Sequence, residues 1–198
     1  MACKVVKLYH LELDYLDVGG GFFGGLPTKP QFDDYLSLIT GILREEFVPE
    51  KTKLILEPGM ALIGAPVHYV TSVIDVKDTI YSRFVVTDGS RTSIDPLMTK
   101  KSYLHRYVTN QNLEKINKQI ICGYTCMEND RLFVAENEQE LCVGDRIIYE
   151  KVGAYTMCLT PLFIKYFPDV YVADGEMLTK VRYAWTEDEY VQNSIAEE

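Results

Sequence analysis

Three short stretches of this sequence combine residue types that can bind or transfer charge. The first is the run Gly19, Gly20 and Gly21, which follows an apolar segment at 15–18. Glycine adopts positive φ without strain, so several backbone N–H groups can point into one small space, which suits a phosphate. The run is not G-x-G-x-x-G, and no G-K-[ST] follows it, so both common nucleotide motifs match weakly. A tight strand-to-helix turn without a ligand explains the run equally well.

The second stretch is Glu57-Pro58-Gly59, directly after a short apolar segment at 53–56. Active sites of α/β proteins place catalytic groups at the carboxyl ends of parallel strands. Buried beside a ring nitrogen, Glu57 would keep that nitrogen protonated. The alternative is a solvated glutamate in a surface turn.

The third stretch is the turn at 123–130, which places the thiol of Cys126 among acidic residues. A thiol there could donate a proton or act as a nucleophile, although no histidine is nearby to activate it. The ordinary role of a lone cysteine in a β-rich region is that of a small buried apolar group.

Further along, Gly153-Ala154-Tyr155 is expected to join a strand to a helix, where the Tyr155 hydroxyl could reach a phosphate. A packed tyrosine is the alternative.

The composition is that of an ordinary globular protein. The 198 residues are 47% hydrophobic and 25% charged, enough for one large domain or two small ones. The net charge of −9 argues against a nucleic-acid or anionic-membrane surface. The chain has no apolar run near the ~18 residues of a membrane span and no apolar secretion signal. The five cysteines form no CxxC pair, so we expect no metal site and reduced thiols in the cytoplasm.

The elements that must position these residues fall into two regions. The first contains the end of a helix at 4–10, strands at 15–18 and 53–56, and a helix with an apolar stripe over Phe32–Glu46. This α/β unit is too small to be a complete domain, and its two strands would leave their edges open.

From about Val67 onward, short β-branched and aromatic runs separated by turn signals predict an antiparallel sandwich or barrel. The apolar spacing over 155–166 predicts a helix, and the acidic tail from Glu187 is expected to be frayed. We therefore divide the chain into 1–66, 67–186 and 187–198. The predicted strands of the second region are 69–76, 82–87, 119–124, 132–134, 145–150 and 170–173.

In this order, the stretches resemble the ornithine/diaminopimelate/arginine decarboxylase family, pyridoxal-phosphate enzymes of the alanine-racemase-like fold. The motifs are Leu-Asp-Val-Gly-Gly-Gly-Phe, Glu-Pro-Gly, Gly-x-x-Cys-x-x-x-Asp, Val-Gly-Asp and Gly-Ala-Tyr. The likeness covers essentially the whole chain but only the second half of the family's pattern. It implies an α+β fold: the last strands and helices of a (β/α)8 barrel, then a C-terminal antiparallel Greek-key β-barrel or sandwich domain.

The resemblance also implies roles around pyridoxal 5'-phosphate, with no metal. The glycines and Tyr155 would bind the cofactor phosphate, and Glu57 would pair with the pyridinium nitrogen. Cys126 would come from the partner subunit of a dimer and donate a proton, with Asp130 beside it in the same turn. The implied cofactor-binding residues are Gly19, Gly20, Gly21, Glu57, Gly59 and Tyr155, and the implied catalytic residues are Cys126 and Asp130.

The sequence departs from the family in four respects. No lysine occupies the context of the family's Schiff-base lysine, which belongs to an early barrel strand, and the histidine that stacks on the ring is missing. Met60 stands where the family usually has arginine. Met127 stands where it often has an acid that recognises the distal amine, so the amino-acid substrate stays open.

The main functional hypothesis is a pyridoxal-phosphate-dependent amino-acid decarboxylase that forms an amine and CO₂ once an N-terminal half completes it. Alone, the chain is expected to be a very poor decarboxylase. We expect it to form a homodimer or to pair with an N-terminal half, without a nucleic-acid or membrane partner. The alternatives are a non-catalytic dimerisation or regulatory partner of an intact decarboxylase, and a racemase of the same fold.

Overall fold

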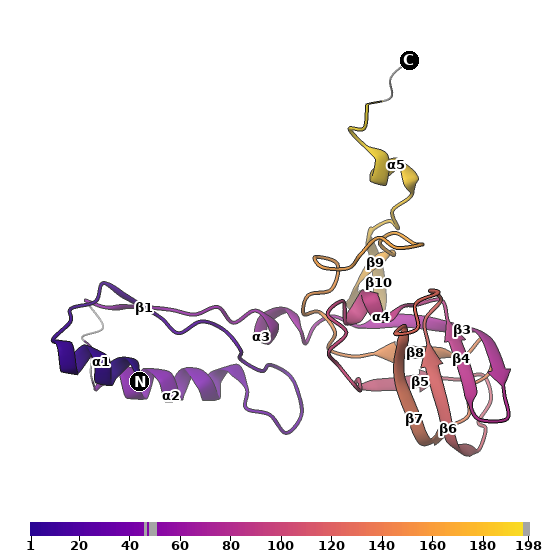
Figure 1. Ribbon diagram of the computed structural model, residues 1–198, viewed down its shortest axis with the longest axis horizontal. Helices are drawn as coiled ribbons and strands as arrows, with labels where there is room; N and C mark the ends of the chain where they lie inside the picture. Colours follow the sequence, from indigo (N-terminus) through magenta and orange to yellow (C-terminus); the bar gives the residue numbers. More distant parts are fainter. Residues whose placement is uncertain (46, 48–50, 196–198) are drawn as a thin grey trace.

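The computed structural model describes residues 1–45, 47 and 51–195. Its first region holds the helices α1 (Ala2–Tyr9) and α2 (Phe32–Arg44) and the short strands β1 (Tyr15–Asp17) and β2 (Lys53–Ile55). The two strands pair in parallel, with Leu16 opposite Leu54, and both helices lie along one side of the pair (Figure 1). The sequence therefore predicted both strands to within one residue.

Helix α2 begins after Gln31, which forms a capping box with Asp34. The Asp34 carboxylate accepts the Gln31 N–H at 2.8 Å, and the Asp34 N–H donates to the Gln31 carbonyl at 3.1 Å. Phe22, only 5% exposed, packs edge-on against the rings of Phe32 and Tyr35 at 5.8 and 5.3 Å. These contacts fix the loop after the glycine run against the start of the helix. Glu46, the predicted last residue of this helix, lies outside the described residues.

The second region is built on one curled sheet of six strands in the order β5-β8-β3-β4-β6-β7. The prediction of a purely antiparallel domain is wrong at one place, because β4 and β6 run parallel, with Phe84 opposite Ile120. A parallel pair requires a long crossover connection. Here the crossover contains the short helix α4 (Arg91–Ile94) and strand β5. The strands are β3 (Tyr69–Asp78), β4 (Arg83–Thr87), β5 (His105–Val108), β6 (Lys115–Cys122), β7 (Arg131–Gln139) and β8 (Arg146–Tyr149).

Side chains join the two outermost strands of this sheet. His105 Nε2 lies 2.9 Å from Glu138 Oε2, and the Tyr107 hydroxyl donates to the same carboxylate. These contacts run from β5 to β7, so the curled sheet surrounds a single core. The largest fully buried side chains of the core are Tyr149, Ile94, Ile121, Leu132, Leu141 and Ile147.

The segment after β8 contradicts the predicted helix over 155–166. Tyr155, Met157 and Ile164 have φ values of 63°, 58° and 69°, which an α-helix does not contain. Pro161 also disfavours helical backbone at the residue before it. The segment consists of turns and bends and leads to a separate hairpin of β9 (Val170–Asp174) and β10 (Met177–Arg182).

The acidic tail is more ordered than expected as far as the structure describes it. A capping box between Thr186 and Glu189 starts the helix α5 (Glu187–Val191). The tail residues 196–198 lie outside the described residues. Within the described part of the chain, no helix is long and apolar enough to cross a membrane.

Candidate functional site

The glycine run and Glu57 are adjacent at the carboxyl ends of β1 and β2. The Glu57 N–H donates to the Gly19 carbonyl at 2.9 Å, and the Val18 N–H donates to the Ile55 carbonyl at 3.2 Å. A Cβ at residue 20 would lie 2.6 Å from the Glu57 carbonyl oxygen, so only glycine fits at Gly20. The parallel pairing thus brings together two stretches that are far apart in the sequence.

The backbone of this turn can accommodate an anionic group. Gly19 and Gly21 have φ values of 70° and 86°, and nothing lies within 4 Å of where a Cβ would project from either residue. The Gly19 N–H donates to Asp17 Oδ1 at 2.8 Å. The N–H groups of Gly20 and Gly21 donate to no acceptor among the residues that the structure describes. Two free N–H donors beside open space fit a phosphate, so the turn is compatible with a phosphorylated cofactor.

Glu57 and Gly59 lie where β2 passes into the helix α3 (Met60–Ile63). The Glu57 side chain is exposed, and its carboxylate has no hydrogen-bond partner in the described part of the chain. Gly59 precedes the helix with a φ of 42°, and its carbonyl accepts the Leu62 N–H at 3.1 Å. The carboxylate is therefore free to pair with a cationic or protonated group outside this chain segment.

The segment that carries Tyr155 packs against α3. The Gly153 N–H donates to the Gly64 carbonyl at 3.1 Å, and a Cβ at residue 153 would lie 2.0 Å from the Ile63 carbonyl oxygen. The Lys151 ammonium donates to the Gly25 carbonyl, in the loop after the glycine run. Tyr155 itself is 58% exposed and stands in a turn, not at a helix start. No contact among the described residues joins its hydroxyl to the glycine turn.

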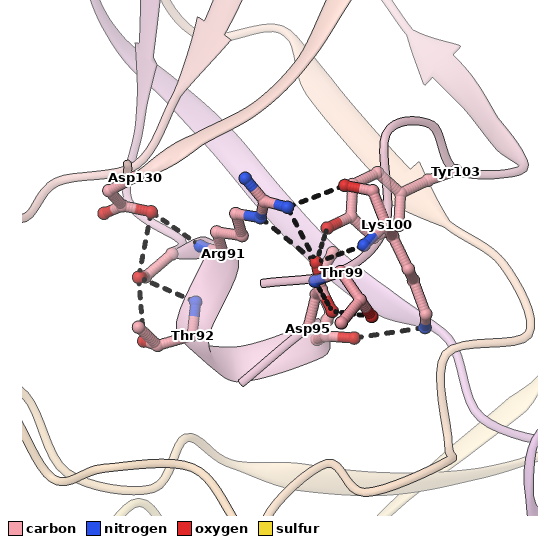
Figure 2. A network of polar contacts seen from close by, with 9 residues as sticks. Arg91, Thr92, Asp95, Thr99, Lys100, Tyr103 and Asp130 are labelled. Carbon is pink, nitrogen blue, oxygen red and sulfur yellow. Dashed lines mark hydrogen bonds and ion pairs between the residues drawn. The ribbon is translucent and has the colours of Figure 1, made fainter. Parts of the chain in front are cut away.

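The other two predicted site residues lie in the turn between β6 and β7. Cys126 is exposed, whereas Asp130 is 2% exposed and accepts hydrogen bonds at both carboxylate oxygens. Asp130 Oδ2 accepts the Thr125 hydroxyl at 2.6 Å and the Thr125 N–H at 3.1 Å. Its Oδ1 accepts the Arg91 N–H at 2.7 Å and the Ser90 hydroxyl at 3.1 Å (Figure 2). The carboxylate thus fixes the Cys126 turn to the start of α4.

A second buried carboxylate, not predicted from the sequence, organises the other end of α4. Asp95 is 3% exposed and pairs with the Arg91 guanidinium, whose Nη2 lies 3.0 Å from Asp95 Oδ2. It also accepts the backbone N–H groups of Thr99 and Lys100 at 3.1 and 2.9 Å (Figure 2). The only sequence signal for this cluster is Ser90, a helix-capping residue after the Asp88-Gly89 turn.

Burial changes the acidity of groups beside the Cys126 turn. Burial, with smaller contributions from Tyr69 and Asp130, raises the pKa of Tyr124 to about 12. The Lys165 ammonium lies 4.1 Å from the centre of the Tyr124 ring. Burial also raises the pKa of the Cys122 thiol at the end of β6.

The predicted site residues therefore fall into two groups. Gly19, Gly20, Gly21, Glu57 and Gly59 form one group, and the segment of Tyr155 packs beside α3. Cys126 and Asp130 form the other group, and no contact among the described residues joins it to the first. In Figure 1, β1 and β2 lie at the opposite end of the molecule from β6 and β7.

Comparison with known proteins shows that the chain is similar to decarboxylases. Residues 65–153 match the model of the family described as "Pyridoxal-dependent decarboxylase, C-terminal sheet domain". The diaminopimelate decarboxylase of Methanothermobacter thermautotrophicus is 28% identical over 171 residues, which cover 81% of this chain and 39% of that protein. The ornithine decarboxylase of Cricetulus griseus is 27% identical over 171 residues, which cover 75% of this chain and 36% of that protein.

The fold is also shared with solved structures. The crystal structure of diaminopimelate decarboxylase from Helicobacter pylori complexed with L-lysine matches with a TM-score of 0.73 at 20% identity. The match covers 95% of this chain and 46% of that one. The chain thus spans less than half the length of the proteins it matches.

Proposed function

Since this chain belongs to the ornithine, diaminopimelate and arginine decarboxylase family as its C-terminal portion, we propose that it forms part of an amino-acid decarboxylase. The family's cofactor is pyridoxal phosphate. The observation that carries the proposal is the junction of the glycine turn with Glu57 at the ends of two parallel strands. This junction offers phosphate donors and a free carboxylate side by side.

Pyridoxal phosphate, when bound, supplies an electron sink for the carbanion that remains when CO₂ leaves an amino acid. In this chain, the N–H groups of Gly20 and Gly21 would donate to its phosphate. The Glu57 carboxylate would accept a hydrogen bond from the protonated ring nitrogen and so keep the ring cationic. Gly59 allows the sharp turn that places Glu57 ahead of α3. Tyr155 would add a hydroxyl donor to the phosphate, through a movement of its exposed side chain.

Cys126 is the proposed proton donor to the substrate carbon. Its thiol is exposed in a turn that the Thr125–Asp130 hydrogen bond closes, a suitable position for a group that must reach the site of a second subunit. The distance between the two groups of site residues supports this arrangement, because one chain alone separates the donor from the cofactor turn. Asp130 acts as a positioning residue, because its oxygens already accept four hydrogen bonds.

The substrate class is a small amino acid, as the names of the relatives suggest. Ornithine and diaminopimelate both carry a second amino group. The residue after Cys126 is Met127, which cannot pair with an amine, whereas Glu128 follows one position later and is exposed. We therefore propose that the substrate is an α-amino acid and do not assign its side chain.

A complementation assay tests this function. The full chain is mixed with the N-terminal part of the Methanothermobacter thermautotrophicus relative, which supplies the remainder of the barrel, and with pyridoxal phosphate. We expect CO₂ release from at least one amino acid in a panel that includes ornithine, diaminopimelate and arginine, and much less from a Glu57→Gln variant. An assembled, cofactor-loaded complex that releases no CO₂ would overturn the proposal. If the chain only changes the rate of an intact decarboxylase, the regulatory alternative holds.

A further inference from the structure

A basic hollow in the sheet domain is not explained by the proposed decarboxylase site. It has a volume of about 390 Å³ and lies between the loop after α4 and the strands β6 and β7. This volume is in the range of small-molecule sites. Four of its lining residues are cationic: Arg91, Lys100, Lys101 and Arg131. No aspartate or glutamate belongs to its lining among the described residues, in a chain with a net charge of −9.

Most of this positive charge is unpaired. Arg91 is neutralised by Asp95 at 3.0 Å. The side chains of Lys101 and Arg131 make no hydrogen bond or ion pair with the residues that the structure describes, although the Arg131 guanidinium stands 5.9 Å from the centre of the Phe84 ring. The Lys100 ammonium donates to the backbone carbonyl of Ile94 at 3.3 Å and stands 5.8 Å from the centre of the Tyr103 ring. Three cationic side chains that have no ion-pair partner among the described residues therefore share one hollow, and the nearby Asp95 carboxylate, which already pairs with Arg91, acts only on Lys100.

The fold holds these charges together. Asp95 accepts the Lys100 N–H at 2.9 Å and fixes the loop that carries Lys100 and Lys101 (Figure 2). Arg131 follows Asp130, whose carboxylate is anchored to the start of α4. Because buried carboxylates fix the backbone at both ends of the hollow, the positions from which the cationic side chains extend are pre-organised. Burial also lowers the pKa of Lys100, with Asp95 opposing it, so an anion nearby would stabilise the charged ammonium.

We propose that this hollow binds a small multivalent anion, either a phosphate ester or a polycarboxylate. Three unpaired cations call for a ligand with at least two negative charges. The guanidinium of Arg131 suits a phosphate or carboxylate because it can donate two parallel hydrogen bonds. Ile120 and Val134 provide an apolar wall for the uncharged part of the ligand. The site does not depend on decarboxylase activity.

Binding of inorganic pyrophosphate and of citrate to the full chain tests the proposal. Titration calorimetry is run at low and at physiological salt, with chloride as the monovalent control. We expect saturable binding of at least one of the two, weakened by salt. The double variant Lys101→Gln/Arg131→Gln should weaken it at least about tenfold, because each lost charge-assisted hydrogen bond reduces affinity by roughly that factor. Both side chains are exposed, so the variant should keep the melting temperature of the wild type.

A second double variant, Lys115→Gln/Lys118→Gln, is the matched control. It removes the same charge from exposed positions on β6 that do not line the hollow. Affinity should change less than about twofold in this control. Tight binding of pyrophosphate alone identifies the ligand as a phosphate ester, and tight binding of citrate alone identifies a polycarboxylate. Failure of both anions to bind, or equal losses in the two double variants, would overturn the proposal.

Discussion

At the residue scale, Cys126 is the group whose replacement most directly tests the proposed chemistry. In the completed enzyme, Cys126→Ala should slow product formation by about 10² to 10⁴, the usual contribution of a positioned proton donor. A proton delivered to the cofactor instead of the substrate carbon would leave the amino group on the cofactor after hydrolysis, so an aldehyde should replace part of the amine product. Chromatographic measurement of both products at saturating substrate checks this outcome.

The matched control is Cys3→Ala, which removes a thiol from α1 at the far end of the chain. Its rate should equal that of the wild type. If Cys126→Ala keeps both the rate and the product ratio, the thiol is not the proton donor.

We predict that Asp130 stabilises the fold around the Cys126 turn and does not take part in the chemistry. In Asp130→Asn, one oxygen becomes an NH₂ group that faces donors, either Thr125 or the pair of Ser90 and Arg91. The loss of the charge-assisted bonds should reduce the free energy of unfolding by about 2–4 kcal/mol. Urea unfolding followed by circular dichroism measures this change. Glu128→Gln, an exposed change of the same kind in the same turn, should stay within about 0.5 kcal/mol. Equal effects of the two variants would contradict the assignment.

At the scale of the elements, buried tyrosine side chains should make the stability of the sheet depend on pH in the alkaline range. Burial is the main cause that raises the pKa of five tyrosines on or beside its strands, Tyr124 to about 12. In the unfolded chain a tyrosine ionises near pH 10, so above that pH the unfolded state loses protons that the folded state retains. Stability should therefore be constant up to about pH 10 and fall between about 10 and 12. The five residues are Tyr69, Tyr103, Tyr107, Tyr124 and Tyr149.

Urea midpoints at a series of pH values test this coupling. Tyr124→Phe removes one ionisable group, so its midpoint should fall less steeply between about pH 10 and 12 than that of the wild type. Tyr81→Phe, at a position that is 88% exposed, should follow the wild-type curve. A wild-type midpoint that stays constant throughout this range would show that these phenols do not govern alkaline unfolding.

The elements also show how far the sequence alone could lead. Strands β1 and β2 were predictable because short apolar runs end at Gly19 and at Glu57-Pro58-Gly59, and local chemistry sets such boundaries. The parallel pairing of β4 with β6 was not predictable, because it depends on partners distant in the chain. The same holds for the Asp95 cluster, in which a carboxylate gathers N–H groups that only the folded loop brings near. The prediction of a helix over 155–166 was wrong because the spacing of its apolar residues was taken as a helical stripe.

At the scale of the whole molecule, the two regions differ in how well they are enclosed. Within the described residues, β1 and β2 pair only with each other, whereas parallel strands are normally covered on both faces and both edges. Neither α1 nor α2 has a buried residue, and Leu8 and Leu38 are 70% and 65% exposed. The six-stranded sheet, by contrast, has a continuous core. Its stability should therefore be independent of the first region.

This difference predicts two levels of protection against hydrogen exchange. In the chain alone, amides of β1 and β2 should exchange at least about a hundredfold faster than those of Ile120 to Cys122, because few packed contacts oppose local opening. Mass spectrometry of peptic fragments after deuterium labelling measures both regions in one sample. Addition of the N-terminal part of a relative should slow exchange at 15–17 and 53–55 while leaving β6 unchanged, because new strands would cover the open edges. Equal protection of the two regions in the chain alone would mean that the short parallel pair is stable without further strands. The glycine turn and Glu57 would then be held in place before any partner arrives, and cofactor phosphate should bind to the isolated chain.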